Sequence, residues 1–183
     1  IIILNLTMGN AAKLMEDSSF RSKTHQASPP GDGWGAFMVY AGVDTSAVKH
    51  LEGLHHQLVN GQPLGNGNSI FLSISPEWDK TRAPENRRAI TLSTHTSMKQ
   101  WWDLFQKNPE AYAKEKENMC DKMLAATDSI IPGFRDSADL VMTGTPITFQ
   151  RFTKRSYGWV GGYPQTNLFR ARSPYLAPGL RMV

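Results

Sequence analysis

The chain has 183 residues, 40% of them hydrophobic, so it can bury one sizeable core, and its length favours a single domain. Twenty Lys and Arg residues against 16 Asp and Glu residues give a formal net charge of +4, which permits an anionic partner but does not require one. The single cysteine, Cys120, excludes an internal disulfide framework, and no apolar run approaches the roughly 20 residues that span a bilayer.

The chain opens on an apolar run, residues 1–6, which is typical of a strand buried on both faces. A short helix is expected over residues 10–15, followed by a loop over 21–33 that collects Ser, Thr, Pro and Gly. Residues 181–183 resemble the start of another strand. We expect both ends to be parts of elements that continue in a larger protein.

Strands are expected over residues 34–43, 57–59, 69–73, 88–94 and 140–143, where β-branched and aromatic residues gather between turn-forming stretches. Residues 50–56 and 76–86 are interpreted as loops. The strands at 57–59 and 69–73 flank the turn-forming Gly65-Asn66-Gly67 and are predicted to form a hairpin.

Helices are expected in the second half of the chain. Ser97 is placed to cap one that runs through Phe105, and Asn108 followed by Pro109 begins the clearest one, which ends at Pro132-Gly133. A further short helix is expected to begin near Thr145-Pro146, and the chain beyond Tyr157 is expected to be mostly irregular. Strands and helices that do not alternate strictly predict an α+β fold with a mixed, mainly antiparallel sheet.

Two polar motifs are interpreted as structural. Gly65-Asn66-Gly67 precedes a strand rather than a helix, so it is not predicted to bind a dinucleotide pyrophosphate. The cluster of His50, Glu52, His55 and His56 lacks the spacing of a zinc helix, and no metal site is predicted. His95 is a conceivable general base, but a hydrogen-bonding role at a strand end is preferred, and Cys120 is expected to be a small buried helix residue.

Aromatic residues outnumber the charged candidates for catalysis. Most rings are expected in the core, but several lie on predicted strands that could line an apolar cavity, and such a cavity suits a long apolar ligand. The candidate substrate-binding residues are Trp34, Phe37, Tyr40, Phe71 and Phe149.

Several segments resemble the substrate domain of FAD-dependent carotenoid oxidoreductases, the family of phytoene desaturases, carotenoid isomerases and carotenoid 3,4-desaturases. They begin with Trp34-Gly35-Ala36-Phe37-Met38-Val39-Tyr40 and Leu54-His55-His56-Gln57. The most specific are Gly144-Thr145-Pro146-Ile147-Thr148-Phe149-Gln150-Arg151-Phe152-Thr153 and Gly161-Gly162-Tyr163-Pro164-Gln165-Thr166. The resemblance extends over nearly the whole chain.

The resemblance implies a flavin amine-oxidase-like protein of two domains. Residues 1–7 would be the edge of the FAD-binding domain, 8–157 the substrate-binding domain, and 158–183 the segment that returns toward FAD. It also implies that Gly161, Gly162, Tyr163 and Pro164 pass close to the flavin ring. The glycine-rich FAD fingerprint is not in this sequence, so residues 1–183 alone are expected to be inactive and free of flavin.

The implied reaction is desaturation or isomerisation of a carotenoid polyene, with the chain supplying the apolar channel over the flavin. The implied setting is the cytoplasm, at a peripheral membrane surface, with no nucleic-acid partner. Two alternatives remain open: another flavin amine-oxidase relative with a different substrate, and a stand-alone basic and aromatic module that binds nucleic acid or lipid.

Overall fold

The structure is a computed structural model that describes Leu6, Asn10, Leu14 and residues 33–160. The strand expected over 1–6, the helix over 10–15, most of the loop over 21–33, and Gly161 to Pro164 therefore lie wholly or largely outside the described residues. The elements are β1 (Trp34–Asp44), α3 (Thr45–Val48), β2 (His55–Val59), β3 (Ser69–Ile74), β4 (Arg87–Ser97), α4 (Met98–Lys107), α5 (Pro109–Asp128), α6 (Phe134–Ser137), β5 (Ala138–Gly144), α7 (Pro146–Thr153) and the short 3-10 helix η1 (Ser156–Gly158).

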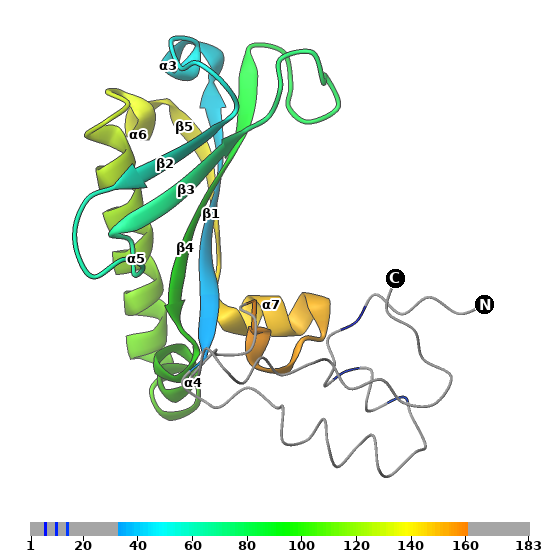
Figure 1. Ribbon diagram of the computed structural model, residues 1–183, viewed down its shortest axis with the longest axis vertical. Coiled ribbons are helices and arrows are strands. Elements are labelled where there is room, and N and C mark those ends of the chain that lie inside the picture. The colour runs from blue at the N-terminus through cyan, green and yellow to red at the C-terminus, as the bar shows by residue number, and fades with distance from the viewer. Residues whose placement is uncertain (1–5, 7–9, 11–13, 15–32, 161–183) are drawn as a thin grey trace, which may run out of the picture.

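The strands of residues 33–160 form one five-stranded sheet in the order β2-β3-β4-β1-β5, and every neighbouring pair is antiparallel (Figure 1). The long strands β1 and β4 pair over their whole length, from Trp34 opposite Ser97 to Asp44 opposite Arg87. The hairpin of β2 and β3 pairs with β4 on one side of these two strands, and β5 pairs with β1 on the other. The antiparallel sheet and its mixture with helices confirm the predicted α+β arrangement.

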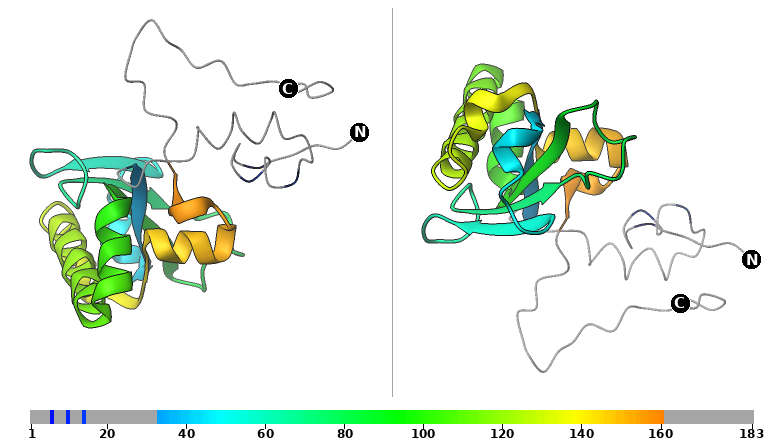
Figure 2. Two further views of the ribbon diagram at one scale, coloured as in Figure 1. Left: turned by 90° about the horizontal axis from the view of Figure 1, so that it is seen from below. Right: turned by 90° about the horizontal axis from the view of Figure 1, so that it is seen from above.

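One face of the sheet is covered by the helices α4 and α5, as both views in Figure 2 show. Alternate residues of β1 point into this layer, where Phe37, Val39 and Val43 are fully buried. Phe37 stacks on Trp101 of α4, with ring centroids 5.3 Å apart. The two rings and the aliphatic side chains around them form the centre of a continuous apolar core, which is the main source of stability in a domain of this size.

The helix starts follow the predicted caps. The Asn108 side chain accepts a hydrogen bond from the amide of Ala111 at the start of α5, and Pro109 takes the first helical position. Ser97 caps α4 through the amide of Gln100. At α7, Thr145 forms a reciprocal capping box with Thr148. These side chains satisfy amide groups that have no partner inside the helix.

The structure corrects several sequence-based expectations. His55 and His56 belong to β2 rather than to a loop, because they pair with Ser73 and Leu72 of β3. The strand β4 extends to Ser97, three residues beyond the prediction, because β1 offers a partner along that whole length. The four-residue helices α3 and α6 were not predicted, and α3 begins where Asp44 accepts hydrogen bonds from Ser46. In the described part of the chain, no helix is long and apolar enough to cross a bilayer.

Candidate functional site

The candidate site lies on the face of the sheet opposite α4 and α5, here called the outer face. Residues that alternate with the buried ones in β1 and β3 point to this side. Three of them are large rings left in contact with solvent: Trp34 is 52% exposed, Tyr40 39% and Phe71 45%. Large apolar side chains gathered on one open face are typical of a binding surface rather than of ordinary protein exterior.

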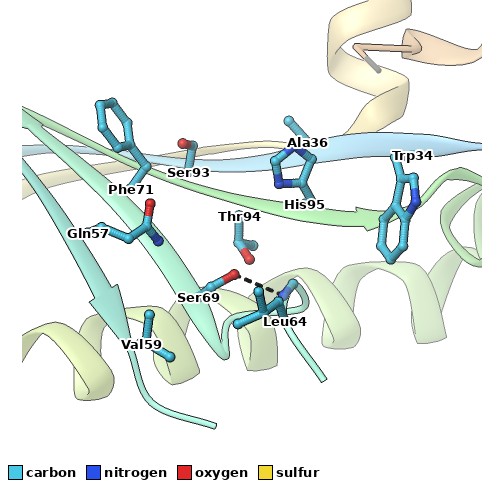
Figure 3. Close-up of a pocket in the computed structure, with 11 residues that line it drawn as sticks. Trp34, Ala36, Gln57, Val59, Leu64, Ser69, Phe71, Ser93, Thr94 and His95 are labelled. Carbon is cyan, nitrogen blue, oxygen red and sulfur yellow. Dashed lines mark hydrogen bonds between the residues drawn. The ribbon is translucent and has the colours of Figure 1, made fainter. Parts of the chain in front are cut away.

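A cavity of about 560 Å³ opens on the outer face (Figure 3). Its size is within the usual range for small-molecule sites. Most of its lining is apolar or small, and His95 is the one ionisable side chain among the described residues that line it. The lining consists of Trp34, Ala36, Gln57, Val59, Leu64, Gly65, Ser69, Phe71, Ser93, Thr94 and His95.

Side chains of β4 create the floor of the cavity. Ser93 and His95 point to the outer face, and Ser93 lies opposite Phe71 on β3 and Met38 on β1. A serine between two large side chains leaves a channel along the strand, because neighbouring strands are only about 4.8 Å apart. The outer face continues beyond Ser93 to Thr91, which lies opposite Tyr40.

At the other end of the channel, Trp34 meets the connection between β2 and β3. Gly65 belongs to this connection, and a Cβ atom placed on it would lie 3.6 Å from Cζ3 of Trp34 and 2.9 Å from the carbonyl oxygen of His95. The imidazole of His95 lies edge-on to Trp34, with ring centroids 6.4 Å apart. The indole therefore reaches across the end of β4 and closes this end of the cavity (Figure 3).

Hydrogen bonds fix the β2–β3 connection against β4 and α5. The amide of Asn66 donates to the carbonyl of His95 over 2.7 Å, and the amide of Gly67 donates to the hydroxyl of Thr94 over 3.0 Å. The hydroxyl of Thr96 donates to the Asn66 side chain, and the ammonium of Lys122 donates to the Asn66 carbonyl. These hydrogen bonds hold the Gly65-Asn66-Gly67 part of the connection against β4 and α5, where it forms a wall of the cavity.

Two further predicted residues lie beside the cavity rather than in it. A Cβ atom placed on Gly144 of β5 would be 3.8 Å from Cε2 of Tyr40, 3.9 Å from Cε2 of Phe149 and 3.8 Å from Cβ of Met38. Tyr40 and Phe149 thus converge over Gly144. These distances are ordinary van der Waals contacts, so both rings border the space above Gly144.

The five predicted substrate-binding residues therefore separate into three groups. Trp34 and Phe71 line the cavity, and Tyr40 and Phe149 meet next to it. Phe37 points to the other side of the sheet and has no exposed surface, so the structure gives it a place in the core. Side chains alternate along a strand, so Phe37 points to the face opposite that of its neighbours Ala36 and Met38.

Sequence reasoning missed Leu64, Val59 and Gln57 as lining residues. Gln57 and Val59 belong to β2, and Leu64 belongs to the connection that follows it. In β4, the apolar residues Ile90 and Leu92 alternate with the smaller polar residues Thr91 and Ser93. This sequence pattern could have indicated that one face of β4 carries small side chains. Leu64 had no comparable signal, because its position depends on long-range hydrogen bonds.

The residues considered for metal binding have other contacts. His55 stacks on Phe71, with ring centroids 5.6 Å apart, and its Nδ1 lies 3.1 Å from the hydroxyl of Ser73. Nε2 of His56 is 3.4 Å from the carbonyl of Gly53. Across residues 33–160, no three His, Cys, Asp or Glu side chains gather where they could hold a metal ion. Cys120 is half-buried in α5, and desolvation raises the pKa of its thiol.

The glycine-containing turn between β2 and β3 does not fit the dinucleotide part of FAD. The turn Gly65-Asn66-Gly67 belongs to the β2–β3 hairpin, as predicted, and its three amides donate to Ser69, His95 and Thr94. Those amides are therefore not available to a pyrophosphate. The predicted flavin contacts, Gly161 to Pro164, lie outside the described residues.

No family model matches the chain. Among curated proteins, it is 35% identical to a chloroplastic prolycopene isomerase of Daucus carota over 134 residues, which are 69% of this chain and 21% of the relative. It is 28% identical to the chloroplastic prolycopene isomerase of Arabidopsis thaliana over 134 residues, 22% of that protein. A prolycopene isomerase of an Oncidium hybrid cultivar is 35% identical over 98 residues, 53% of this chain and 16% of the relative. The chain thus matches about a fifth of the length of these relatives.

Proposed function

The chain belongs to the carotenoid oxidoreductase family, and from that premise we propose that it is the substrate-binding part of an enzyme that isomerises a carotenoid polyene. The proposal assigns residues 8–157 to a substrate-binding domain of the flavin amine-oxidase-like kind. The names of the relatives favour isomerisation over desaturation.

The observation that carries the proposal is the apolar cavity on the outer face. Its lining is dominated by apolar and small side chains, and Trp34 and Phe71 are its large rings. A hydrocarbon polyene offers no hydrogen-bonding groups, so its binding depends on burying apolar surface, at about 25 cal/mol per Å². Flat rings also suit a flat conjugated chain, because they offer extensive contact with little loss of side-chain freedom.

The two aromatic groups of the outer face suit an elongated ligand. Phe71, Ser93, Met38 and Gly144 form one row across four neighbouring strands, and Tyr40 and Phe149 converge at the Gly144 end of that row. A polyene lying along β4 would contact Phe71 on one side and Met38 or Tyr40 on the other. We propose that Phe71 and Tyr40 hold the chain in this way, with Phe149 beside Tyr40 over Gly144 and Trp34 at the end of the cavity.

FAD belongs to the proposal as the cofactor of the full-length protein. When bound, it would supply the redox chemistry, and we propose that Gly161, Gly162, Tyr163 and Pro164 lie near its ring system. The part played by the described residues is to bind and orient the polyene and to keep water from it. No catalytic base is assigned.

We also propose that the protein works at a membrane surface, because a hydrocarbon polyene dissolves in lipid. Phe152 at the end of α7 is 74% exposed, and the guanidinium of Arg151 lies over its ring at 5.6 Å from the centroid. An exposed apolar ring beside basic side chains matches an anionic lipid surface. The same combination prompted the alternative of a nucleic-acid-binding module, which the relatives do not favour.

The proposal is tested by the polyene content of the full-length protein purified from cells that make carotenoids. Bound polyene should be present, and Phe71→Ala should lower its affinity about tenfold, which corresponds to roughly 1.4 kcal/mol of lost contact. Trp78→Ala is the matched control, because Trp78 is 81% exposed and lies in the connection between β3 and β4, not in the cavity lining. The proposal would be refuted if the full-length protein bound no polyene. It would also be refuted if Trp78→Ala lowered the polyene affinity as much as Phe71→Ala.

A further inference from the structure

We infer that Trp34 and the β2–β3 connection form a fixed end stop that sets how far an apolar chain can enter the cavity, and so selects ligands by length. This inference rests on the proposed function, because it concerns how the same cavity chooses among polyenes. It assigns to Trp34 a specificity role that is distinct from the general contact provided by Phe71.

The geometry at this end of the cavity carries the inference. The ring of Trp34 extends from β1 across the end of β4 and comes within van der Waals distance of the space above Gly65. Leu64, next to Gly65, also lines the cavity, where it is 54% exposed (Figure 3). A chain that advances along β4 past Ser93 and His95 would meet the indole.

The wall is built to resist displacement. Gly65 has a φ of +91°, and a Cβ atom there would lie 2.9 Å from the backbone of His95, so only glycine fits at this contact. The hydroxyl of Thr96 donates to Asn66 and also accepts a hydrogen bond from the buried indole of Trp101, over 2.8 Å in both cases. The connection is thus linked to the core, and moving it would leave buried polar groups without partners.

The opposite end of the outer face has no such closure within the described residues. Beyond Ser93 the face continues to Thr91, and Tyr40 beside it is 39% exposed. A ligand held by Phe71 can therefore extend in that direction. Toward Trp34 its extension is limited by the indole. A site that is blocked at one end discriminates by length, because each carbon that does not fit either stays in water or strains the wall.

The test compares affinities of the full-length protein for a series of acyclic polyenes with identical ends and increasing length. Binding is followed by the shift of the polyene absorption band. The unmodified protein should lose affinity sharply beyond one length. Trp34→Ala should relax that limit, improving binding of the first excluded polyene about tenfold relative to the last accepted one. Trp34→Phe retains a ring and should keep most of the limit.

Controls separate the possible failures. Phe71→Ala should weaken binding of every polyene by a similar factor and leave the length limit in place. If the protein binds no polyene of any length, the proposed function fails. If it binds them and Trp34→Ala changes all affinities equally, the function stands and the end stop is refuted. Circular dichroism of each variant verifies that the fold is retained.

Discussion

The hydroxyl of Tyr112 in α5 lies 2.8 Å from the hydroxyl of Thr145, the residue that caps α7. This contact joins two helices that are far apart in the chain and fixes the start of α7, which carries Phe149. We expect Tyr112→Phe to lower the free energy of unfolding by about 0.5–1.5 kcal/mol, because it removes one partly buried hydrogen bond.

Urea denaturation measures this change. Tyr157→Phe is the matched control, because the structure gives the Tyr157 hydroxyl no hydrogen bond among residues 33–160, and Tyr157 is 45% exposed. Its free energy of unfolding should stay within about 0.5 kcal/mol of the unmodified value. If both variants lost the same free energy of unfolding, the hydrogen bond of the Tyr112 hydroxyl would make no specific contribution to stability.

Truncation of Phe37 and truncation of Phe71 should affect different properties of the protein. Phe37→Ala removes a fully buried ring and should cost about 3–5 kcal/mol of stability. Phe71→Ala removes a ring that is 45% exposed, so its cost in stability should be smaller and its main effect should be on polyene binding. Thermal unfolding and polyene affinity are measured on both proteins. A Phe37→Ala protein of normal stability would contradict its assignment to the core.

Asp103 in α4 should make the stability of the protein depend on pH in the acid range. Hydrogen bonds from Lys99 and then Lys107 lower the pKa of its carboxyl from the ordinary 3.8 to about 2. Because the folded-state pKa is below the unfolded-state value, the stabilisation is complete above pH 3.8 and is lost as the pH falls through about 2.

Asp103→Asn should therefore lower stability at neutral pH slightly and flatten the dependence of the unfolding free energy on pH between these two values. Denaturation curves recorded across that range measure the effect. High salt should reduce the difference, since all three side chains are at the surface and are screened. An unchanged pH dependence in Asp103→Asn would show that the ion pairs contribute nothing in solution.

Phe152 should contribute to membrane binding through its position beside Arg151 and Lys154. We expect Phe152→Ser to weaken flotation of the full-length protein with anionic vesicles several-fold, since it removes an exposed ring from a basic surface. Trp78→Ser is the control, because Trp78 is equally prominent but stands between Glu77 and Asp79. Equal losses in the two variants would argue against a specific role for Phe152.

Local sequence patterns were sufficient to predict most elements of the fold. Asn108 with Pro109 marks the start of α5, and Thr145 with Pro146 marks that of α7, because capping depends only on residues a few positions apart. The strands β1 and β3 begin where predicted for a similar reason. The order of the strands was not predicted, since it depends on pairings such as that of Met38 with Gly144.

The site was predicted less completely than the fold. Aromatic residues were recognisable in the sequence as candidates for ligand binding. Their residue type alone could not show that Phe37 faces the core and Tyr40 the outer face, which required the strand register. The wall at Gly65 was interpreted only as a turn. Its contact with Trp34 is produced by tertiary structure, since it requires β1 and the hairpin to meet across β4.

The position of β1 in the sheet has a consequence for how the chain is made. Its two neighbours, β4 and β5, both follow it by long stretches of sequence, whereas β2, β3 and β4 can pair in turn as they emerge from the ribosome. One edge of β1 must therefore remain unpaired until β4 has been made, and the other until β5 has been made. Such late, long-range pairing slows folding and prolongs the exposure of apolar surface. Production of this protein should therefore benefit from slow translation and from chaperones that bind nascent chains.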